Sequence, residues 1–482
     1  MMNKEKTIGW NFDNSYSNLP KSFIYEISPV PVKRPELVIL NHDLADQMGL
    51  NFSNVDNEQL AKMFSGNLLP KGSKSLAQAY AGHQFGHFTM LGDGRAVLLG
   101  EHISKSNQRL DIQFKGSGQT PFSRNGDGRA ALGPMLREYL ISEAMHSLNI
   151  PTTRSLAVVK TGENVIREKP LQGAILTRVA SSHIRVGTFQ FIRTRENLDE
   201  LNTLVNYTIK RHYPEISKSK NNAYDLLSKL IDKQIELVVN WMRVGFIHGV
   251  MNTDNMAISG ETIDYGPCAF MDSYNLGTCF SSIDHMGRYA YGNQPAITKW
   301  NLARFAECLL TLINPNKDDA LKMATELIDK FDKIYEEKWF NMMKSKLGLI
   351  GDNKEDNLII FELLEIMKKQ ELDYTNTFLF LMDHEIDDKK SYQNEEFDNW
   401  KMKWQKRLTK DSKNLMELNN PVIIPRNHNV ENVLKSAENN DLTPFNDLLQ
   451  ALKNPYTNQK VLNKYQSPPP KSDEKYQTFC GT

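Results

Sequence analysis

The sequence predicts an α+β protein in which a strand-rich region precedes a helix-rich region. From about residue 75 to 185, short apolar or alternating runs are separated by Gly-containing turns, a pattern typical of strands. From about residue 186 onward, apolar residues recur at helical spacing over much longer stretches. The 482 residues are 40% hydrophobic and 24% charged, so the chain can bury a large core and is neither fibrous nor wholly disordered. A ligand crevice is expected where the two regions meet.

Two hairpins and two further strands are expected in the first region. One hairpin has its tip at Gly92–Arg95 and the other at Thr161–Gly162, because glycine favours tight turns between apolar runs. Residues 110–115 alternate apolar and polar side chains, as a strand with one buried face does. The expected strands cover residues 88–91, 96–99, 110–115, 155–159, 164–167 and 173–179.

Three helices are predicted individually. Residues 131–147 carry apolar side chains at helical spacing, which places one helix within the strand-rich region. Asn197 followed by Glu200 resembles a capping box and predicts a helix that continues to about residue 212. Residues 223–244 hold a broad apolar stripe, which is typical of a largely buried helix. Helical patterns dominate again from about 300 to 455.

Charge, cysteine content and hydropathy exclude several classes of protein. Lys plus Arg (58) equals Asp plus Glu (58), so the chain lacks the basic field of a nucleic-acid-binding protein, although a local basic pocket for phosphate is compatible with this balance. The 4 cysteines are too few for a secreted disulfide framework. No apolar run approaches ~18 residues, and the first residues form no signal segment. These features predict a cytoplasmic protein with no nucleic-acid or membrane partner.

Two Gly-rich turns are candidates for phosphate binding. Gly92 and Gly94 would let backbone N–H groups approach an anion, and Arg95 could add a bidentate contact. Asp127 and Gly128 lie in a second turn of this kind. A plain tight turn explains either segment equally well when it is taken alone.

An ion pair between Lys115 and Glu138 is a second candidate feature. Lys115 ends a predicted strand, and Glu138 lies on the predicted helix that follows. Protein kinases use a strand lysine held by a helix glutamate beside the nucleotide phosphates. The alternative is an ordinary surface pair.

The stretch from 245 to 266 follows the long buried helix and carries the most information. His248 begins a kinase-like pattern, Asn255 lies five residues after position 250, and Asp264 opens an Asp-Tyr-Gly segment. Asn255 and Asp264 could therefore ligate Mg²⁺, which takes oxygen ligands. Position 250 is Val250 rather than the usual aspartate base, and Asp254 is the nearest substitute.

The chain resembles the selenoprotein O (YdiU) family in three blocks: GHQFGHFTMLGDGRAVLLGE, IQFKGSGQTPFSRNGDGRAALGPMLREYL and HGVMNTDNMAISGETIDYGPCAFMDSY. The resemblance implies a protein-kinase-like two-lobed fold with a strand-rich N-lobe and a helical C-lobe. It also implies transfer of AMP from ATP to protein hydroxyls, with the nucleotide bound in a flipped orientation. UMP transfer is implied as well for bacterial members.

The resemblance assigns roles residue by residue. Asp254 is expected to accept the proton of the attacking hydroxyl, and Asn255 and Asp264 are expected to hold Mg²⁺ or Mn²⁺. Arg178 and Arg185 are expected to clamp phosphate, an expectation that spacing alone does not give. The residues expected to bind the nucleotide are Gly92, Gly94, Arg95, Lys115, Asp127, Gly128, Arg178, Arg185 and Asp264.

These expectations divide the chain into four parts. Residues 1–74 form an N-terminal extension that packs on the core, and residues 75–185 form the strand-rich nucleotide-binding lobe. Residues 186–466 form the helical lobe with the catalytic and metal-binding loops. Residues 467–482 form a mobile tail that carries Cys480 at the place of the family's reactive residue. The tail is expected to reach Cys279 in a reversible disulfide, with a free terminal thiol as the alternative.

The expected partners are ATP and proteins with Ser, Thr or Tyr hydroxyls, and the chain is expected to be a monomer. Two alternative functions remain open at this point: an ordinary kinase that transfers the γ-phosphoryl group, and an inactive nucleotide-binding scaffold. Val250 favours the scaffold over the kinase, whereas the joint presence of Lys115, Glu138, Asn255 and Asp264 argues against a scaffold that has lost its metal.

Overall fold

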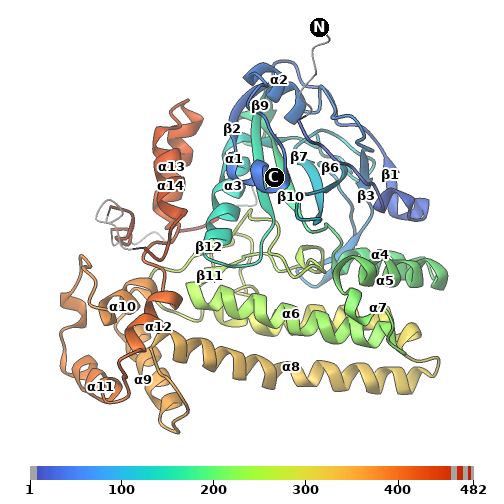
Figure 1. Ribbon diagram of the computed structural model, residues 1–482. Helices are drawn as coiled ribbons and strands as arrows, with labels where there is room; N and C mark the ends of the chain where they lie inside the picture. The colour runs from blue at the N-terminus through green and yellow to red at the C-terminus, as the bar shows by residue number, and fades with distance from the viewer. Residues whose placement is uncertain (1–7, 458–463, 471–475, 479–482) are drawn as a thin grey trace.

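The computed structural model describes residues 8–457, 464–470 and 476–478. Its main feature is an eight-stranded sheet whose strands all pair antiparallel (Figure 1). Along the sheet the strands are β1 (Ile24–Glu26), β3 (Leu76–Gln78), β6 (Ala96–Ile103), β7 (Arg109–Lys115), β10 (Pro170–Ala180), β9 (Arg154–Ile166) and β2 (Glu36–Leu40), and β8 (Ala130–Ala131) pairs with β10.

Helices cover both faces of this sheet. Helices α1 (His42–Met48) and α2 (Asn57–Phe64) pack on one face, in a core that includes Ile112 and Ile175. Helix α3 (Leu132–Ser147) packs on the other face, against Leu176. Since Ile175 and Leu176 are neighbours on β10, the alternation of a strand sends them into different cores.

The helical part begins directly after β10, and in Figure 1 most of it lies below the sheet, while its last two helices stand beside the sheet. Its central helix, α6, packs against α7 and α8, and α13 returns to contact α3. The helices are α4 (Val186–Thr194), α5 (Leu198–His212), α6 (Asn222–Val244), α7 (Gln294–Ile313), α8 (Lys317–Lys346), α9 (Asp356–Lys369), α10 (Tyr374–Leu381), α11 (Glu395–Gln405), α12 (Ser412–Asn419), α13 (Asn427–Glu438) and α14 (Thr443–Leu452).

The predicted α+β class and the three individually predicted helices are confirmed. Helix α3 covers the expected range, and α5 begins where the Asn197 side chain accepts a hydrogen bond from the backbone N–H of Glu200 at 3.1 Å. Helix α6 is capped at its C-terminus by Gly245, whose φ of 72° is the left-handed conformation that glycine adopts at low cost.

Both predicted hairpins are wrong. Strand β5 (His87–Met90) pairs with β4 (Ala81–Gln84) in a separate two-stranded sheet, so Gly92–Arg95 connects that sheet to β6 instead of turning a hairpin. The real tip is at Phe85 and Gly86, both with positive φ. Strand β9 runs straight through Gly162, because a register shift in its pairing with β10 accommodates the glycine's φ of 71°.

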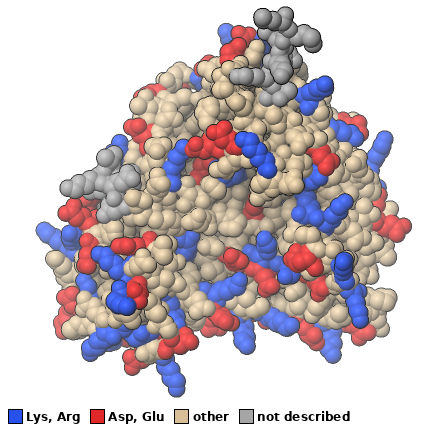
Figure 2. All heavy atoms as spheres, in the orientation of Figure 1, with Lys and Arg blue, Asp and Glu red and all other residues tan. Residues whose placement is uncertain are grey.

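The first 74 residues contribute strands to the main sheet. Strand β1 pairs with β3, and β2 pairs with β9, so each forms one edge of the sheet. Within the described residues, no helix has the length and apolar character needed to cross a membrane. Figure 2 shows basic and acidic side chains interspersed over the visible face, so neither sign of charge dominates it.

Candidate functional site

A buried ion-pair cluster joins β7, α3 and β10. Lys115 Nζ lies 2.7 Å from Glu138 Oε2, so the Lys–Glu pair anticipated from the sequence is present in the structure. Arg178 Nε donates to Glu138 Oε1 at 2.7 Å. All three side chains are nearly inaccessible to solvent, with exposed fractions of 6%, 3% and 5% for Lys115, Glu138 and Arg178. One carboxylate therefore fixes two cations side by side.

Asp264 completes this cluster on its solvent side. Its Oδ1 accepts a hydrogen bond from Lys115 Nζ and lies 3.3 Å from Arg178 Nη2. Burial alone would raise the pKa of Asp264, but Lys115, Arg178 and Arg95 hold that pKa well below its usual range. The side chain is still 33% exposed, so an ionised carboxylate faces the outside of the cluster.

The backbone at Asp264 is strained in a way that aims this carboxylate. Its φ is 70°, a left-handed conformation uncommon for a residue other than glycine. The next residue, Tyr265, is fully buried, and its hydroxyl hydrogen-bonds to Thr152. On the other side, His248 Nε2 lies 2.9 Å from the carbonyl oxygen of Ile263. These two anchors keep the segment in its strained form.

Asp254 lies in a single 3₁₀ turn, Thr253–Asn255, within the loops that follow β11 (Phe246–Ile247) and precede β12 (Ala269–Phe270). It is only 8% exposed, and its Oδ1 has no hydrogen-bond partner among the described residues. Burial raises the pKa of the Asp254 carboxyl to about 6. An under-satisfied buried carboxylate that ionises near neutral pH is suited to accepting a proton.

The β4–β5 hairpin fixes the position of this turn. The backbone N–H of His83 donates to Thr253 Oγ1 at 2.7 Å, and the backbone N–H of Phe85 donates to Asn252 Oδ1 at 3.1 Å. Thr253 Oγ1 in turn donates to Gln190 of α4 at 2.6 Å. The hairpin and α4 thus hold the turn from two sides.

Gly82 makes the closest approach to Asp254. A Cβ at this position would lie 2.1 Å from Asp254 Oδ1, so Gly82→Ala should push the carboxylate aside. We expect turnover to fall by about 10²-fold with little change in nucleotide affinity, because a displacement of about 1 Å is enough for such a loss. Single-turnover rates and nucleotide binding, measured on the same preparation, check this.

Gly277→Ala is the matched control. A Cβ there would come no closer than 3.3 Å to Asn275, and the residue lies outside the cluster. Equal activity of the two variants would contradict the positioning role assigned to Gly82.

Arg185 links the Asp254 turn to the end of β10. Its Nη1 donates to the backbone carbonyl of Asp254 at 3.1 Å, and its Nε donates to the carbonyl of His183 at 3.1 Å. The guanidinium also lies over the ring of Tyr80, 4.2 Å from the ring centroid. Arg185 is 6% exposed, so its charge is held near Asp254 without an ion pair of its own among the described residues.

The Gly92–Arg95 segment lies under the loop that carries Phe122. A Cβ on Gly92 would lie 2.3 Å from the Phe122 ring, and one on Gly94 would lie 2.8 Å from its carbonyl oxygen. These glycines are therefore explained by close packing within the protein. Arg95 contributes its charge to the low pKa of Asp264, which places it within electrostatic reach of the cluster.

The structure does not bring Asp127 into contact with the cluster. Asp127 Oδ2 pairs with Arg167 Nη1 at 2.9 Å, and its Oδ1 accepts from the backbone N–H of Arg129 at 2.9 Å. Gly128 packs against the backbone of Gly118, where a Cβ would lie 2.1 Å from the carbonyl oxygen. The nucleotide roles expected for Asp127 and Gly128 remain predictions.

Asn255 and Asp264 offer oxygen ligands of the kind a divalent cation takes. Asn255 Nδ2 donates to the carbonyl of Val250 at 3.0 Å, and within the described residues nothing donates to its Oδ1. Asp264 is ionised, and Asp254 Oδ1 is orphaned. No group of three or more His, Cys, Asp or Glu side chains gathers at one point in the described part of the chain. The donor set therefore fits a cation that draws further oxygens from a bound phosphate or water.

Cys480 lies outside the described residues, so the expected disulfide with Cys279 stays a prediction. Thr478 lies beside the segment that carries Cys279. It forms an isolated β-bridge with Ser281, and its backbone N–H donates to the carbonyl of Phe280 at 2.7 Å. Cys279 Sγ donates to Asp284 at 3.3 Å, and burial, together with Asp284, raises the pKa of its thiol to about 11.

Comparison with known proteins decides the family. The model of the family described as protein adenylyltransferase SelO matches residues 6–453. The chain belongs to this SelO family. It is 65% identical to the protein nucleotidyltransferase YdiU of Pelagibacter ubique, over 99% of this chain and 100% of that protein. It is 55% identical to the YdiU proteins of Nitrosococcus oceani and Bacillus thuringiensis, over at least 99% of each chain. As a SelO family member the chain is an enzyme, a protein nucleotidyltransferase.

Sequence reasoning missed the residues that position Asp254. Gly82, His83, Thr253 and Gln190 come from three separate segments, and no spacing rule brings them together. The only available signal was the Gly-His-Gln-Phe-Gly block that resembles the SelO family, which contains the first two of these residues but gives them no role.

Proposed function

We propose that this chain transfers AMP from ATP to Ser, Thr or Tyr hydroxyls of other proteins, and that UTP can serve as a second donor. We also propose that the sheet region and the helical region act as the two lobes of a protein-kinase-like fold. The observation that carries the proposal is the buried cluster of Lys115, Glu138 and Arg178 with the exposed carboxylate of Asp264.

This cluster suits a triphosphate. Lys115, Arg178 and Arg185 would neutralise phosphate oxygens, and Glu138 keeps the first two in place. With the ionised Asp264 included, the three cations exceed the two carboxylates by one positive charge. Asn255 and Asp264 would hold Mg²⁺ or Mn²⁺, which supplies further charge neutralisation at the phosphates when bound. The chemistry then needs mainly positioning.

The transfer step uses Asp254 as the proton acceptor. The oxygen of the acceptor hydroxyl attacks the α-phosphorus, the bond from that phosphorus to the bridging oxygen breaks, and pyrophosphate leaves. The hydroxyl proton passes to the Asp254 carboxylate, whose raised pKa, about 6, leaves it ionised yet basic at neutral pH. Arg185 holds the Asp254 backbone during this step.

Two labelled nucleotides separate this proposal from its alternatives. We expect proteins incubated with the enzyme, Mg²⁺ and ATP to gain label from [α-³²P]ATP and none from [γ-³²P]ATP, because the α-phosphoryl group is transferred with its nucleoside. Label from the γ position alone would establish a kinase, and label from neither would favour a scaffold. [α-³²P]UTP in a parallel reaction tests the second donor.

A further inference from the structure

A large cavity lies away from the proposed nucleotide site. Its volume is about 1090 Å³, and its borders include the start of β7, the end of β10, the last turns of α5 and the loop at residues 259–261. None of the residues assigned to nucleotide, metal or catalysis lines it. Ligand pockets in proteins commonly measure roughly 300–1,000 Å³, so the space suits a whole small molecule.

The lining of this cavity is strongly basic. Five lining residues carry a positive charge and only one, Glu261, is acidic. The basic residues are Arg109, Arg154, Lys210, Arg211 and Lys233. Glu261 is occupied by hydroxyl and backbone donors, since Ser181 Oγ donates to it at 2.8 Å and Ser259 Oγ at 2.9 Å.

In the part of the chain that the structure describes, the arginines of the lining are in ion pairs, whereas the lysines are not. Arg109, Arg154 and Arg211 are each paired with a carboxylate of the protein, at 2.6–2.7 Å. Lys210 and Lys233 have no ion pair within the described residues. The two lysines are therefore the cations left to meet an anionic ligand.

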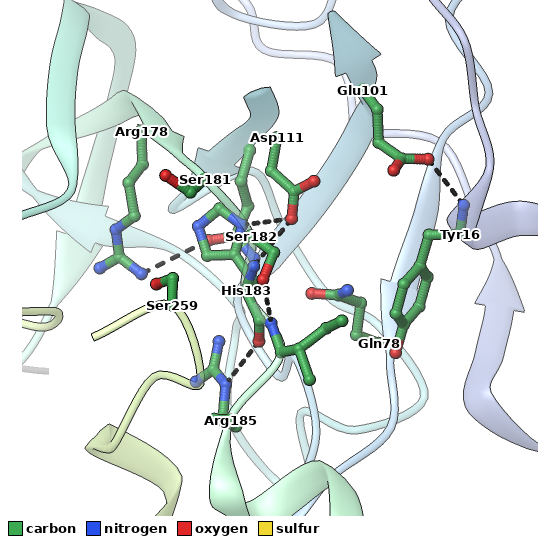
Figure 3. A network of polar contacts seen from close by, with 12 residues as sticks. Tyr16, Gln78, Glu101, Asp111, Arg178, Ser181, Ser182, His183, Arg185 and Ser259 are labelled. Carbon is green, nitrogen blue, oxygen red and sulfur yellow. Dashed lines mark hydrogen bonds and ion pairs between the residues drawn. The ribbon is translucent and has the colours of Figure 1, made fainter. Parts of the chain in front are cut away.

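A chain of hydrogen bonds connects the cavity wall to the proposed catalytic residue, and Figure 3 shows its central part at Asp111, His183 and Arg185. Arg211 Nη2 donates to Asp111 Oδ1 at 2.6 Å, and the backbone N–H of His183 donates to Asp111 Oδ2 at 2.8 Å. The carbonyl of His183 accepts from Arg185, which binds the backbone of Asp254. The N–H groups of Arg211 are all used within the protein, so an occupant held by Lys210 and Lys233 would border, at Arg211, one end of a buried network whose other end holds Asp254.

We propose that this cavity binds a small polyanion bearing phosphate or carboxylate groups, and that binding there is coupled to nucleotide binding through Arg211, Asp111, His183 and Arg185. Packed networks of hydrogen bonds and ion pairs can carry such coupling, typically about 5–150-fold in affinity. The proposal concerns binding and stands whether or not AMP is the group transferred.

Titration calorimetry with two probes tests whether the cavity binds a small polyanion. Fructose 1,6-bisphosphate supplies phosphates and tricarballylate supplies carboxylates, and each is titrated into full-length protein saturated with a non-hydrolysable ATP analogue and Mg²⁺. We expect at least one probe to bind, and the double variant Lys210→Ala, Lys233→Ala to bind it at least tenfold more weakly. The matched control is Lys218→Ala with Lys220→Ala, which removes the same charge outside the cavity lining and should leave binding unchanged.

The same variants test the coupling. The affinity for the ATP analogue should change about fivefold or more when the probe is present in wild type and in the control, and should not change in the cavity variant. Failure of both probes to bind, equal binding by all three proteins, or loss of binding when the nucleotide site is filled would overturn the cavity assignment. An analogue affinity indifferent to bound probe would overturn the coupling.

Discussion

Asp264→Ala should abolish nucleotidyl transfer, with a loss of at least about 10³-fold in kcat/KM. The variant removes the ionised carboxylate that faces out of the buried cluster and is one of the two proposed metal ligands. It also leaves Lys115 and Arg178 with one shared carboxylate, Glu138, in place of two. We therefore expect weaker binding of Mg²⁺–nucleotide as well as slower transfer, measured by calorimetry and by label incorporation from [α-³²P]ATP.

Asp352→Ala controls for the loss of an aspartate as such. Asp352 is itself fully exposed, pairs with Lys344 at 2.8 Å and lies far in sequence from the cluster, and an ion pair with an exposed partner contributes little to stability. Circular dichroism should show both variants folded. Near-wild-type transfer by Asp264→Ala at low Mg²⁺ would remove Asp264 from the proposed metal site.

Asp254→Asn should lower turnover by about 10²–10⁴-fold, the usual contribution of a general base, while nucleotide affinity changes little. In the wild type a proton acceptor with a pKa of about 6 must be ionised to work. Transfer should therefore rise as pH increases through about 6 and level off above it. The variant should lack this rise, and a pH–rate profile from pH 5 to 8 records the difference.

The same substitution should stabilise the protein at neutral pH. The Asp254 carboxyl has an ordinary pKa of 3.8 and a folded-state pKa of about 6, so the folded protein binds more protons in the interval between them. Stability contributed by this group therefore falls as pH rises through that interval, and its full cost, up to about 3 kcal/mol, applies above it. Asp254→Asn removes the cost, and urea unfolding at pH 5 and pH 7.5 should show a larger gain at the higher pH.

A matched loss of ATP affinity with unchanged turnover would make Asp254 a binding residue. A variant less stable than wild type at pH 7.5 would contradict the raised pKa. The two measurements are independent, because one follows the reaction and the other follows unfolding.

The parts of the fold that the sequence predicts are those set by local chemistry. Helix α5 is capped by Asn197 and ends in basic residues, and α6 has its stripe and its terminal Gly245, so each helix is specified within its own residues. The two hairpins failed because strand pairing is not local. Gly92 and Gly162 both looked like turns, but their neighbours pair with β4 and β10, which the intervening sequence cannot reveal.

The residues of the candidate site also fall into two groups, those that local sequence patterns predict and those that depend on distant segments. The pairing of Lys115 with Glu138 and the opening of the Asp-Tyr-Gly segment at Asp264 follow patterns that can be read along the chain. Arg178 and Arg185 needed the family resemblance, because an arginine on a strand has no distinctive spacing. The burial of Asp254 beneath Gly82 depends on segments about 170 residues apart, as the hydrogen bond from His83 to Thr253 shows.

The sheet's two outer strands carry a consequence for how the protein assembles. Both β1 and β2 come from the first 40 residues, and as short edge strands of 3 and 5 residues they leave less unpaired backbone at the edges than the 13-residue β9 would. During synthesis these two edge strands are made first. Strand β2 cannot pair until β9 has been made, more than a hundred residues later. Pairings so distant in sequence slow folding. The growing chain therefore depends on its earliest residues staying available until the centre of the sheet exists, and the finished sheet gains protection from edge-to-edge aggregation only at that last step.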